Sequence, residues 1–420
     1  MRKLIALLTV GMLFCIFSAT GSSGSVPMGV AASDGPFGAD FAALSAGNYS
    51  SGDGTAENPY RIANIFDLME LTNSPDDWGK SFLMTADIDC IGVAIAPIGS
   101  YAVPFTGIFD GAGHVISNLT INKPTQNYVG LFGYVDSGGQ IKNLGVVNVN
   151  VIGDRCVGGL AGYNEGGTLT SCYAAGSVYG TSIHVGGLVG RNSGTLTSCY
   201  ATGSVDGTIR AGGLAGGNFG ALISCYATGS VTGSSSVGGL AGLNSWSGIL
   251  TFCYATGSVE GTDFVGGVAG YNGEEGTLTS CFWDVDTSGL SAGVGFDEDQ
   301  SARVTGKSTM EMQTLSTFTD AGWDFTDETV NGIYDYWRMC ADGADYPRLR
   351  WEYSTIGDFA CPDSVNLEDL CIYLDGWLMD SCGPDNDYCD GVDLDHSGSV
   401  DIKDFSILSE HWMASLRPIG

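Results

Sequence analysis

Five near-copies of one short sequence occupy residues 157–272, and they decide the fold. They read Val157-GGLAG-Tyr163-Asn164, Val185-GGLVG-Arg191-Asn192, Ala211-GGLAG-Gly217-Asn218, Val237-GGLAG-Leu243-Asn244 and Val265-GGVAG-Tyr271-Asn272. A cysteine follows each copy at the same place, and successive cysteines are 26 to 28 residues apart: Cys172, Cys199, Cys225, Cys253 and Cys281. A period of this size is typical of a solenoid, in which one unit cannot bury its apolar face alone but stacked units can.

The composition of the repeat predicts strands. Each copy is rich in Gly, Thr, Ser, Val and Tyr, and glycine costs about 1 kcal/mol per position inside a helix, so helical pairs are excluded. Short runs such as Val-Gly-Gly-Leu-Ala-Gly and Thr-Leu-Thr-Ser-Cys-Tyr are typical of strands separated by glycine corners. Three short strands per coil, repeated in one register, predict a parallel β-helix in which like side chains stack about 4.8 Å apart.

Three columns of like side chains follow from that register. An asparagine column at a corner is expected to bond to its own neighbours and to the turn backbone: Asn164, Asn192, Asn218, Asn244 and Asn272. An aliphatic column is expected to point inward: Leu160, Leu188, Leu214, Leu240 and Val268. The third column is aromatic: Tyr173, Tyr200, Tyr226, Tyr254 and Phe282. We interpret it as structural, with glycan binding by exposed stacked tyrosines as the alternative.

The Gly-Gly-Leu-hydrophobic-Gly repeats resemble the GLUG motif of bacterial surface and secreted proteins. Tyr128-Val129-Gly130-Leu131-Phe132-Gly133 looks like a diverged first repeat, and residues 104–121 resemble the first coils of such β-helices. Two sequences near the end of this region are similar to the segment that follows GLUG repeats: Gly322-Trp323-Asp324-Phe325 and Asp345-Tyr346-Pro347-x-Leu349-x-Trp351. The resemblance covers about residues 47–350 and implies a right-handed β-helix in an extracellular setting, without implying one activity.

Charge and the amino terminus place the chain outside the cell. The 47 acidic and 16 basic residues give a net charge of −31, which argues against nucleic acid or an anionic membrane as partner, because both require Lys and Arg. Arg2 and Lys3 precede an apolar run, Leu4–Phe17, as in a secretory signal, and the run is too short for a membrane span. We therefore expect a secreted or cell-surface protein.

The predicted organisation has six parts. They are a signal peptide at 1–24, a flexible lead-in at 25–46, N-terminal β-helix coils at 47–155, GLUG repeats at 156–282, a closing segment at 283–353 and a small α-helical calcium-binding module at 355–416. The chain has 13 cysteines. The repeat cysteines are expected to form a buried thiol ladder, because stacked side chains do not aim well at each other, whereas Cys382 and Cys389 are candidates for a disulfide.

Residues 393–404 predict a calcium site. A twelve-residue loop supplies oxygen donors at positions 1, 3, 5, 9 and 12 and a carbonyl at position 7, with Gly398 at position 6 for the sharp turn and Val400 pointing inward. Ca²⁺ takes six to eight oxygen ligands, and this spacing wraps them around one point. The predicted ligands are Asp393, Asp395, Ser397, Ser399 (through its carbonyl), Asp401 and Asp404. An exiting helix is expected from Phe405 to Trp412.

A second copy of the loop–helix pattern lies 35 residues earlier, and a tandem with Asp at position 12 resembles a type I dockerin. The first half keeps Asp358, Asn366 and Asp369 but has Ala360 and Pro362 where ligands are expected, so its site is weak or lost. The resemblance implies a cohesin-like or cell-surface partner. In dockerins the positions that bind cohesin are commonly Ser-Thr. In this chain they are Leu367-Glu368 and Ile402-Lys403, which depart from the family.

The repeats contain few groups for catalysis, and we assign no catalytic residue. Asp206 and Glu260 share a column two coils apart, with Thr232 between them. His184 and Arg210 occupy a variable column that we expect to be a solvated face. The aromatic residues of 283–353 are expected to cap the open end of the solenoid, with a sugar-stacking platform as the alternative.

Two function classes remain open. The favoured one is a non-catalytic secreted or surface β-helix, an adhesion or binding scaffold attached through its calcium-binding module. The alternative is a carbohydrate-active β-helix, a polysaccharide lyase or hydrolase. Polysaccharide is a candidate partner, and the sequence does not identify the ligand of the solenoid. The decisive feature is whether acidic and basic groups converge in a groove.

Overall fold

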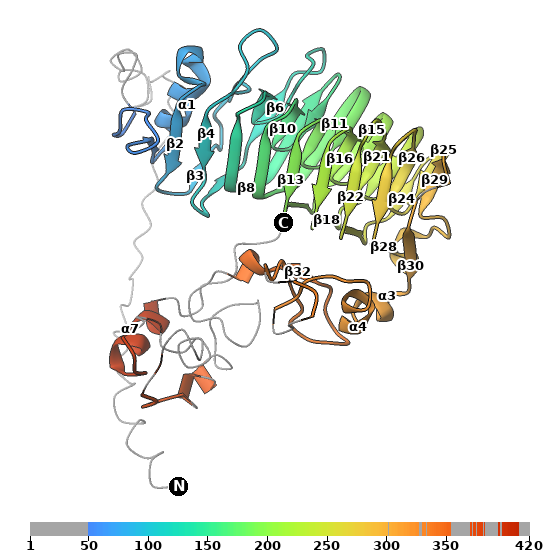
Figure 1. Cartoon of the computed structure of the whole chain (residues 1–420). Helices are drawn as coiled ribbons and strands as arrows, with labels where there is room; N and C mark the ends of the chain where they lie inside the picture. Colours follow the sequence, from blue (N-terminus) through green and yellow to red (C-terminus); the bar gives the residue numbers. More distant parts are fainter. Residues whose placement is uncertain are drawn as a thin grey trace, which may run out of the picture. The chain divides into compact units, whose positions relative to one another are not determined.

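The structure is a computed structural model that describes residues 49–300, 302–326, 330–332, 334–353, 370–371, 373–374, 376–380, 382, 394 and 397–410. The predicted signal peptide and lead-in lie outside these residues. The solenoid comprises residues 60–307, which form parallel coils that are seen edge-on in Figure 1. The prediction of a mainly β, parallel solenoid is confirmed, and the expected right hand of the coil stays a prediction.

The first coils form a broad amino-terminal end whose interior is continuous with the rest of the core. Helix α1 (Ile65–Asn73) places Leu68 and Leu71 in the same apolar cluster as Phe82 of β2. Asn64 caps the helix by accepting from the backbone N–H groups of Phe66 and Asp67. The other elements here are β1 (Tyr60–Ile62), η1 (Pro75–Asp77), β2 (Ser81–Met84), β3 (Ile88–Asp89), β4 (Ile108–Asp110), β5 (Val115–Ser117) and β6 (Thr120–Asn122).

One face of the solenoid is a seven-stranded parallel sheet built from the Ala-Gly-x-Asn part of each repeat. Tyr163 pairs with Arg191, Arg191 with Gly217, and Asn164 with Asn192, so the repeats stack without slippage. The diverged first repeat joins in the same register, with Val135 in the place of asparagine. The strands are β7 (Phe132–Val135), β10 (Ala161–Asn164), β12 (Val189–Asn192), β16 (Ala215–Asn218), β21 (Ala241–Asn244), β26 (Ala269–Asn272) and β29 (Val294–Asp297).

The remaining faces of the coils form the larger sheet. Its strands along the coils are β8 (Gln140–Gly153), β9 (Val157–Gly158), β11 (Thr168–Gly186), β13 (Thr195–Thr197), β14 (Tyr200–Ala201), β15 (Ser204–Gly212), β17 (Ala221–Ile223), β18 (Tyr226–Ala227), β19 (Val231–Thr232), β20 (Ser235–Gly238), β22 (Ile249–Thr251), β23 (Tyr254–Ala255), β24 (Val259–Glu260), β25 (Asp263–Gly266), β27 (Thr277–Thr279), β28 (Cys281–Asp284) and β30 (Val304–Lys307). A coil thus has more than the three predicted strands. Single left-handed residues, such as Ser198 (φ 52°) and Ser224 (φ 49°), bend the chain where the sequence suggested one continuous strand.

The asparagine column forms the predicted ladder. Each side-chain amide donates to the Oδ1 of the next asparagine, at 2.8 to 2.9 Å, and to a carbonyl of its own turn. Asn272 ends the series by donating to Asp297 Oδ1 at 2.8 Å. All five asparagines are fully buried. The ladder therefore satisfies polar groups that would otherwise be costly inside the solenoid.

The aliphatic and cysteine columns face the interior, as predicted. The five aliphatic residues are fully buried, and so are the five repeat cysteines. The cysteines are free thiols, and each Sγ lies near a carbonyl oxygen of the preceding coil, as for Cys199 and Leu169 at 3.5 Å. Burial raises the pKa of the Cys199 and Cys253 thiols, which favours their neutral form.

The aromatic column is structural, because the closing segment covers it. Tyr173, Tyr200, Tyr226 and Tyr254 stack with ring centroids 4.8 to 5.0 Å apart, and each is at most 8% exposed. Fully buried Trp323 and Trp337 pack against the column. The alternative of exposed, glycan-binding tyrosines is wrong for this column.

The closing segment lies along the flank of the coils as well as following the last of them. Its elements are α2 (Val285–Ser288), α3 (Thr309–Met312), α4 (Leu315–Thr319), β31 (Trp337–Arg338), β32 (Arg348–Leu349) and η2 (Arg350–Tyr353) (Figure 1). Trp351 donates to Ser198 O at 2.9 Å, and Tyr254 donates to Pro347 O at 2.6 Å. The segment thus spans several coils rather than ending the stack alone.

The glycines of the repeat permit the close approach of successive coils. A methyl group at Gly213 would collide with the carbonyl oxygen of Gly239 and lie 3.0 Å from the Ala227 Cβ. We expect Gly213→Ala to lower the free energy of unfolding by about 1–3 kcal/mol, the usual cost of overpacking a core. Urea unfolding checks this, with Gly79→Ala as control, since the nearest atom to its new Cβ lies at 3.5 Å. Equal losses in the two variants would contradict the steric argument.

Candidate functional site

The described part of the predicted calcium loop has several features of such a loop. Gly398 has φ +97°, the left-handed turn expected at position 6. Val400 is fully buried against Tyr373 and Leu408, as predicted for position 8. The carboxylate of Asp404 is buried and accepts from Asp401 N at 2.8 Å. Helix α7 (Ile402–Glu410) begins within the last three positions of the loop, earlier than the predicted start at Phe405.

The calcium assignment itself stays a prediction. Ser397, Ser399, Asp401 and Asp404 are described, whereas Asp393 and Asp395 lie outside the described residues, as do the weaker set Asp358, Asn366 and Asp369. Within the described ranges no three His, Cys, Asp or Glu side chains converge as a metal site. Cys382 is disulfide-bonded, and Cys389 lies outside the described residues, so their pairing is untested. Trp377 packs on Tyr373, with ring centroids 5.6 Å apart.

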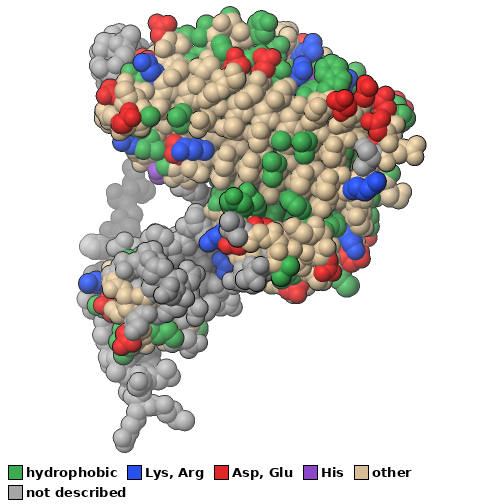
Figure 2. Space-filling model, viewed as in Figure 1, with side chains coloured by type: hydrophobic (Ala, Val, Ile, Leu, Met, Phe, Trp, Pro, Cys, Tyr) green, Lys and Arg blue, Asp and Glu red, His purple; other side chains and the backbone are tan. Residues whose placement is uncertain are grey.

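A second candidate lies on the solenoid itself, where a hollow of about 640 Å³ opens beside the seven-stranded sheet. We call it the arginine hollow, after the six side chains that give it its character: Arg155, His184, Arg191, Arg210, Phe219 and Trp246. Glu274 and Glu298 lie among its other lining residues. Figure 2 shows basic, hydrophobic and acidic side chains lying close together along one edge of the solenoid.

Two columns of the repeat meet in this hollow. The first is the corner position before each Val-Gly-Gly or Ala-Gly-Gly, which is left-handed in every coil, with φ 64° at His184 and 57° at Arg210. The second is the position before each ladder asparagine, where Tyr163, Arg191 and Gly217 are neighbours. Because Gly217 has no side chain, the His184 ring lies over it, and a Cβ there would collide with the imidazole.

His184 carries its imidazole proton at Nδ1, the nitrogen that lies against Gly217. Its Nε2 lies 3.2 Å from Arg210 Nη1, and since a guanidinium only donates, Nε2 accepts and Nδ1 carries the proton. The side chain is 2% exposed, and Nδ1 has no partner among the described residues. Burial, reinforced by Arg210, Arg191 and Arg155, lowers the pKa of His184 to about 3, so the imidazole is neutral at physiological pH.

Aromatic rings position the central arginine. The Arg191 Cζ lies 4.9 Å from the Tyr163 ring centroid and 4.4 Å from that of Phe219, which places the guanidinium between two coils. Arg191 Nε is buried without a hydrogen-bond partner among the described residues. Phe219 also contacts Trp246, with centroids 5.7 Å apart, and the Trp246 side chain is 68% exposed.

The hollow gathers positive charge in an acidic protein. Three of the chain's 16 basic residues line it, and in the part of the chain that the structure describes none of the three forms an ion pair. Burial and the neighbouring Arg191 and Arg155 lower the pKa of Arg210, although a guanidinium stays charged in proteins. Mutual repulsion of these groups favours a bound anion.

The prediction of a solvated face at His184 and Arg210 is wrong. His184 is buried and Arg210 is half-buried, because the left-handed corner turns both side chains back over the neighbouring sheet. The sequence reasoning also missed Arg155, Arg191, Phe219 and Trp246. The sequence carried one signal that could have located the hollow, a change of residue type within the repeat. Arg191 and Gly217 interrupt a column that Tyr163, Leu243 and Tyr271 otherwise occupy.

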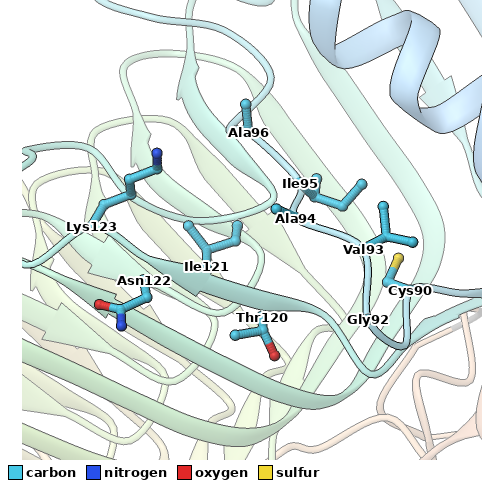
Figure 3. A pocket seen from close by; sticks show the side chains of 10 residues that line it. All are labelled: Cys90, Gly92, Val93, Ala94, Ile95, Ala96, Thr120, Ile121, Asn122 and Lys123. Atoms are coloured by element: carbon cyan, nitrogen blue, oxygen red, sulfur yellow. The ribbon is translucent and has the colours of Figure 1, made fainter. Parts of the chain in front are cut away.

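The other candidates contribute less. Asp206 and Glu260 do share a column through Thr232, and both are exposed. A hollow of about 500 Å³ in the first coils lies between residues 90–96 and β6, and its lining is mainly apolar with Lys123 as its one charged side chain (Figure 3). Among the described helices, none has the length and apolar character needed to cross a lipid bilayer.

Comparison with known families finds the GLUG motif at residues 153–179 and 181–206. Together with the stacked coils, this match identifies GLUG repeats within a parallel β-helix, as the sequence resemblance predicted. The chain is 38% identical to halomucin of Haloquadratum walsbyi over 152 residues, 33% of this chain and 2% of halomucin. It is 35% identical over 127 residues to a candidate Gly-rich membrane protein of Evansella cellulosilytica, 28% of this chain and 15% of that protein.

The chain therefore spans only a small part of the length of these curated relatives. Among solved structures, a candidate immunoglobulin A1 protease from Bacteroides ovatus aligns with a TM-score of 0.48 and 22% identity, covering 72% of this chain and 95% of that one. A similarity at this level carries no argument about activity.

Proposed function

We propose that the chain is a secreted or cell-surface β-helix that binds a ligand without transforming it, and that residues 355–416 attach it elsewhere through a calcium-binding, dockerin-like module. A surface location agrees with the relatives, one of which is described as a membrane protein. The predicted signal peptide and the charge of −31 support the same location.

The chemistry of the arginine hollow carries the non-catalytic part of this proposal. A lyase or hydrolase needs a group that accepts a proton at the reacting centre. His184 does not meet this need, because its Nε2 accepts from Arg210 and its Nδ1 already carries a proton. The pKa of about 3 also makes the imidazole a weak base at neutral pH. Glu274 and Glu298 also line the hollow, and Glu298 already accepts from Tyr271 OH at 3.0 Å and from Glu274 N at 3.2 Å. The three arginines beside them favour binding, and the product-release assay tests the two carboxylates.

The proposal is tested by incubating the full chain with polygalacturonate and with a neutral glucan. We expect neither new reducing ends nor the ultraviolet absorbance of an unsaturated sugar product. Product release that disappears in Glu274→Gln or Glu298→Gln, which change the carboxylates of the hollow, or in Asp206→Asn or Glu260→Gln, would overturn the proposal and favour the alternative, a carbohydrate-active β-helix enzyme.

The attachment module yields a separate prediction about calcium. Asp404→Ala should abolish the tightest Ca²⁺ binding of the full chain, whereas Asp369→Ala should have a smaller effect, because the first loop already lacks ligands. Calorimetric titration checks this, and bound calcium should also raise the thermal stability of the module, since clustered carboxylates repel one another without the ion. Asp206→Ala, on the exposed solenoid surface, is the control. A titration of the unmodified chain without heat or gain in stability would refute the assignment.

A further inference from the structure

We infer that the arginine hollow binds an acidic sugar, with its anionic group held by Arg191 and Arg210 and its ring against Phe219 and Trp246. This inference rests on the proposed binding function and names the ligand class of that site. Nothing in the GLUG match assigns a ligand to these residues.

The polar groups of the hollow that lack partners are donors. Nδ1 of His184 and Nε of Arg191 are both buried and unpartnered among the described residues. A buried donor without a partner is unfavourable, so an acceptor that reaches it is bound more tightly. Two guanidinium groups suit the oxygens of a carboxylate or sulfate, because charge-assisted bonds from arginine are strong and often bidentate.

Arg191 is prepared for this role by its surroundings. Its guanidinium lies between the rings of Tyr163 and Phe219, so little side-chain freedom remains to be lost when the anion binds. The tautomer of His184 also matters, because the single in-plane lone pair of a neutral imidazole would repel an anion if it faced the hollow. Here that lone pair is already used at Nε2 by Arg210.

The aromatic residues indicate a ligand with an apolar face. The Trp246 side chain is 68% exposed, next to Phe219 and beside the arginines. An exposed indole in contact with a cationic cluster suits a ring that carries C–H groups on one face and an acid at its edge, as in a uronate or a sulfated sugar.

The experiment uses the full chain and isothermal titration with three probes: an oligogalacturonate, a sulfated galactan oligomer and a neutral cello-oligomer. We expect one or both acidic probes to bind, and Arg191→Gln and Arg210→Gln each to weaken that binding at least about tenfold. Arg303→Gln removes the same charge from an exposed position outside the hollow and should change the affinity less than about twofold. Trp246→Ala should also weaken binding, and circular dichroism verifies that each variant folds.

The outcomes separate this inference from the proposed function. Equal affinity for the neutral oligomer, absence of binding by both acidic probes, or acidic binding unaffected by Arg191→Gln and Arg210→Gln would each overturn the inference. None of these results concerns catalysis, which the product-release assay tests. Binding by only one acidic probe supports the inference and shows whether the hollow prefers a carboxylate or a sulfate.

Discussion

Replacing Asn218 with leucine is expected to destabilise the solenoid by about 2–5 kcal/mol, because leucine has a similar size but cannot continue the ladder. Asn218 accepts from Asn192 Nδ2 at 2.9 Å and donates to Asn244 Oδ1 at 2.8 Å and to Gly220 O at 3.1 Å. The side chain is fully buried, so water cannot replace these bonds. Neighbouring coils would then retain polar groups with fewer partners.

Urea unfolding of the full chain measures this loss. Asn122→Leu is the matched control, because Asn122 is an exposed strand residue in β6 and should change the free energy of unfolding by less than about 0.5 kcal/mol. If Asn218→Leu unfolds at the same urea concentration as the unmodified chain, the ladder does not stabilise the fold and its regularity has another origin.

The second large effect concerns Glu352 of the closing segment, whose side chain is 5% exposed. Tyr226 OH donates to Glu352 Oε2 at 2.8 Å, and Leu349 N donates to Oε1 at 2.7 Å. Burial raises the pKa of this carboxyl to about 7 from 4.5, against the opposing hydrogen bonds and Arg348. The folded chain therefore holds this proton more tightly than the unfolded chain does.

The resulting stabilisation is complete below about pH 4.5 and is lost as the pH rises through about 7. The pKa difference corresponds to at most about 3 kcal/mol. Glu352→Gln is neutral at every pH and keeps an acceptor, so it should remove this contribution. We expect the variant to match the unmodified chain near pH 5 and to be more stable by up to about 3 kcal/mol near pH 8.5.

Tryptophan fluorescence during unfolding reports this difference. Trp323 and Trp337 are buried in the same aromatic cluster as Tyr226, the residue that donates to Glu352. Glu165→Gln, at an exposed position of a repeat turn, should leave the pH profile unchanged. A stability difference between Glu352→Gln and the unmodified chain that is constant from pH 5 to pH 8.5 would mean that Glu352 titrates normally.

The amino-acid sequence determined the repeating architecture by itself. A period of 26 to 28 residues fixes which side chains stack, because parallel coils in one register place equivalent residues a strand spacing apart. The chain alone could therefore predict the asparagine ladder, the buried aliphatic and cysteine columns and the diverged first repeat at 128–133. The same period carried the resemblance to GLUG repeats.

The tertiary structure alone decided which faces of the coils are covered and which remain open. The sequence favoured a structural role for the tyrosine column but did not show what covers it. The tyrosines are buried because residues as distant as Trp351 return along the flank, a contact across 153 residues that no local pattern encodes. The left-handed corner likewise turns His184 and Arg210 toward Gly217 and Arg191 of the neighbouring sheet. The arginine hollow arises from that meeting of two columns, since the direction of a corner side chain depends on its backbone dihedral angles rather than on the period.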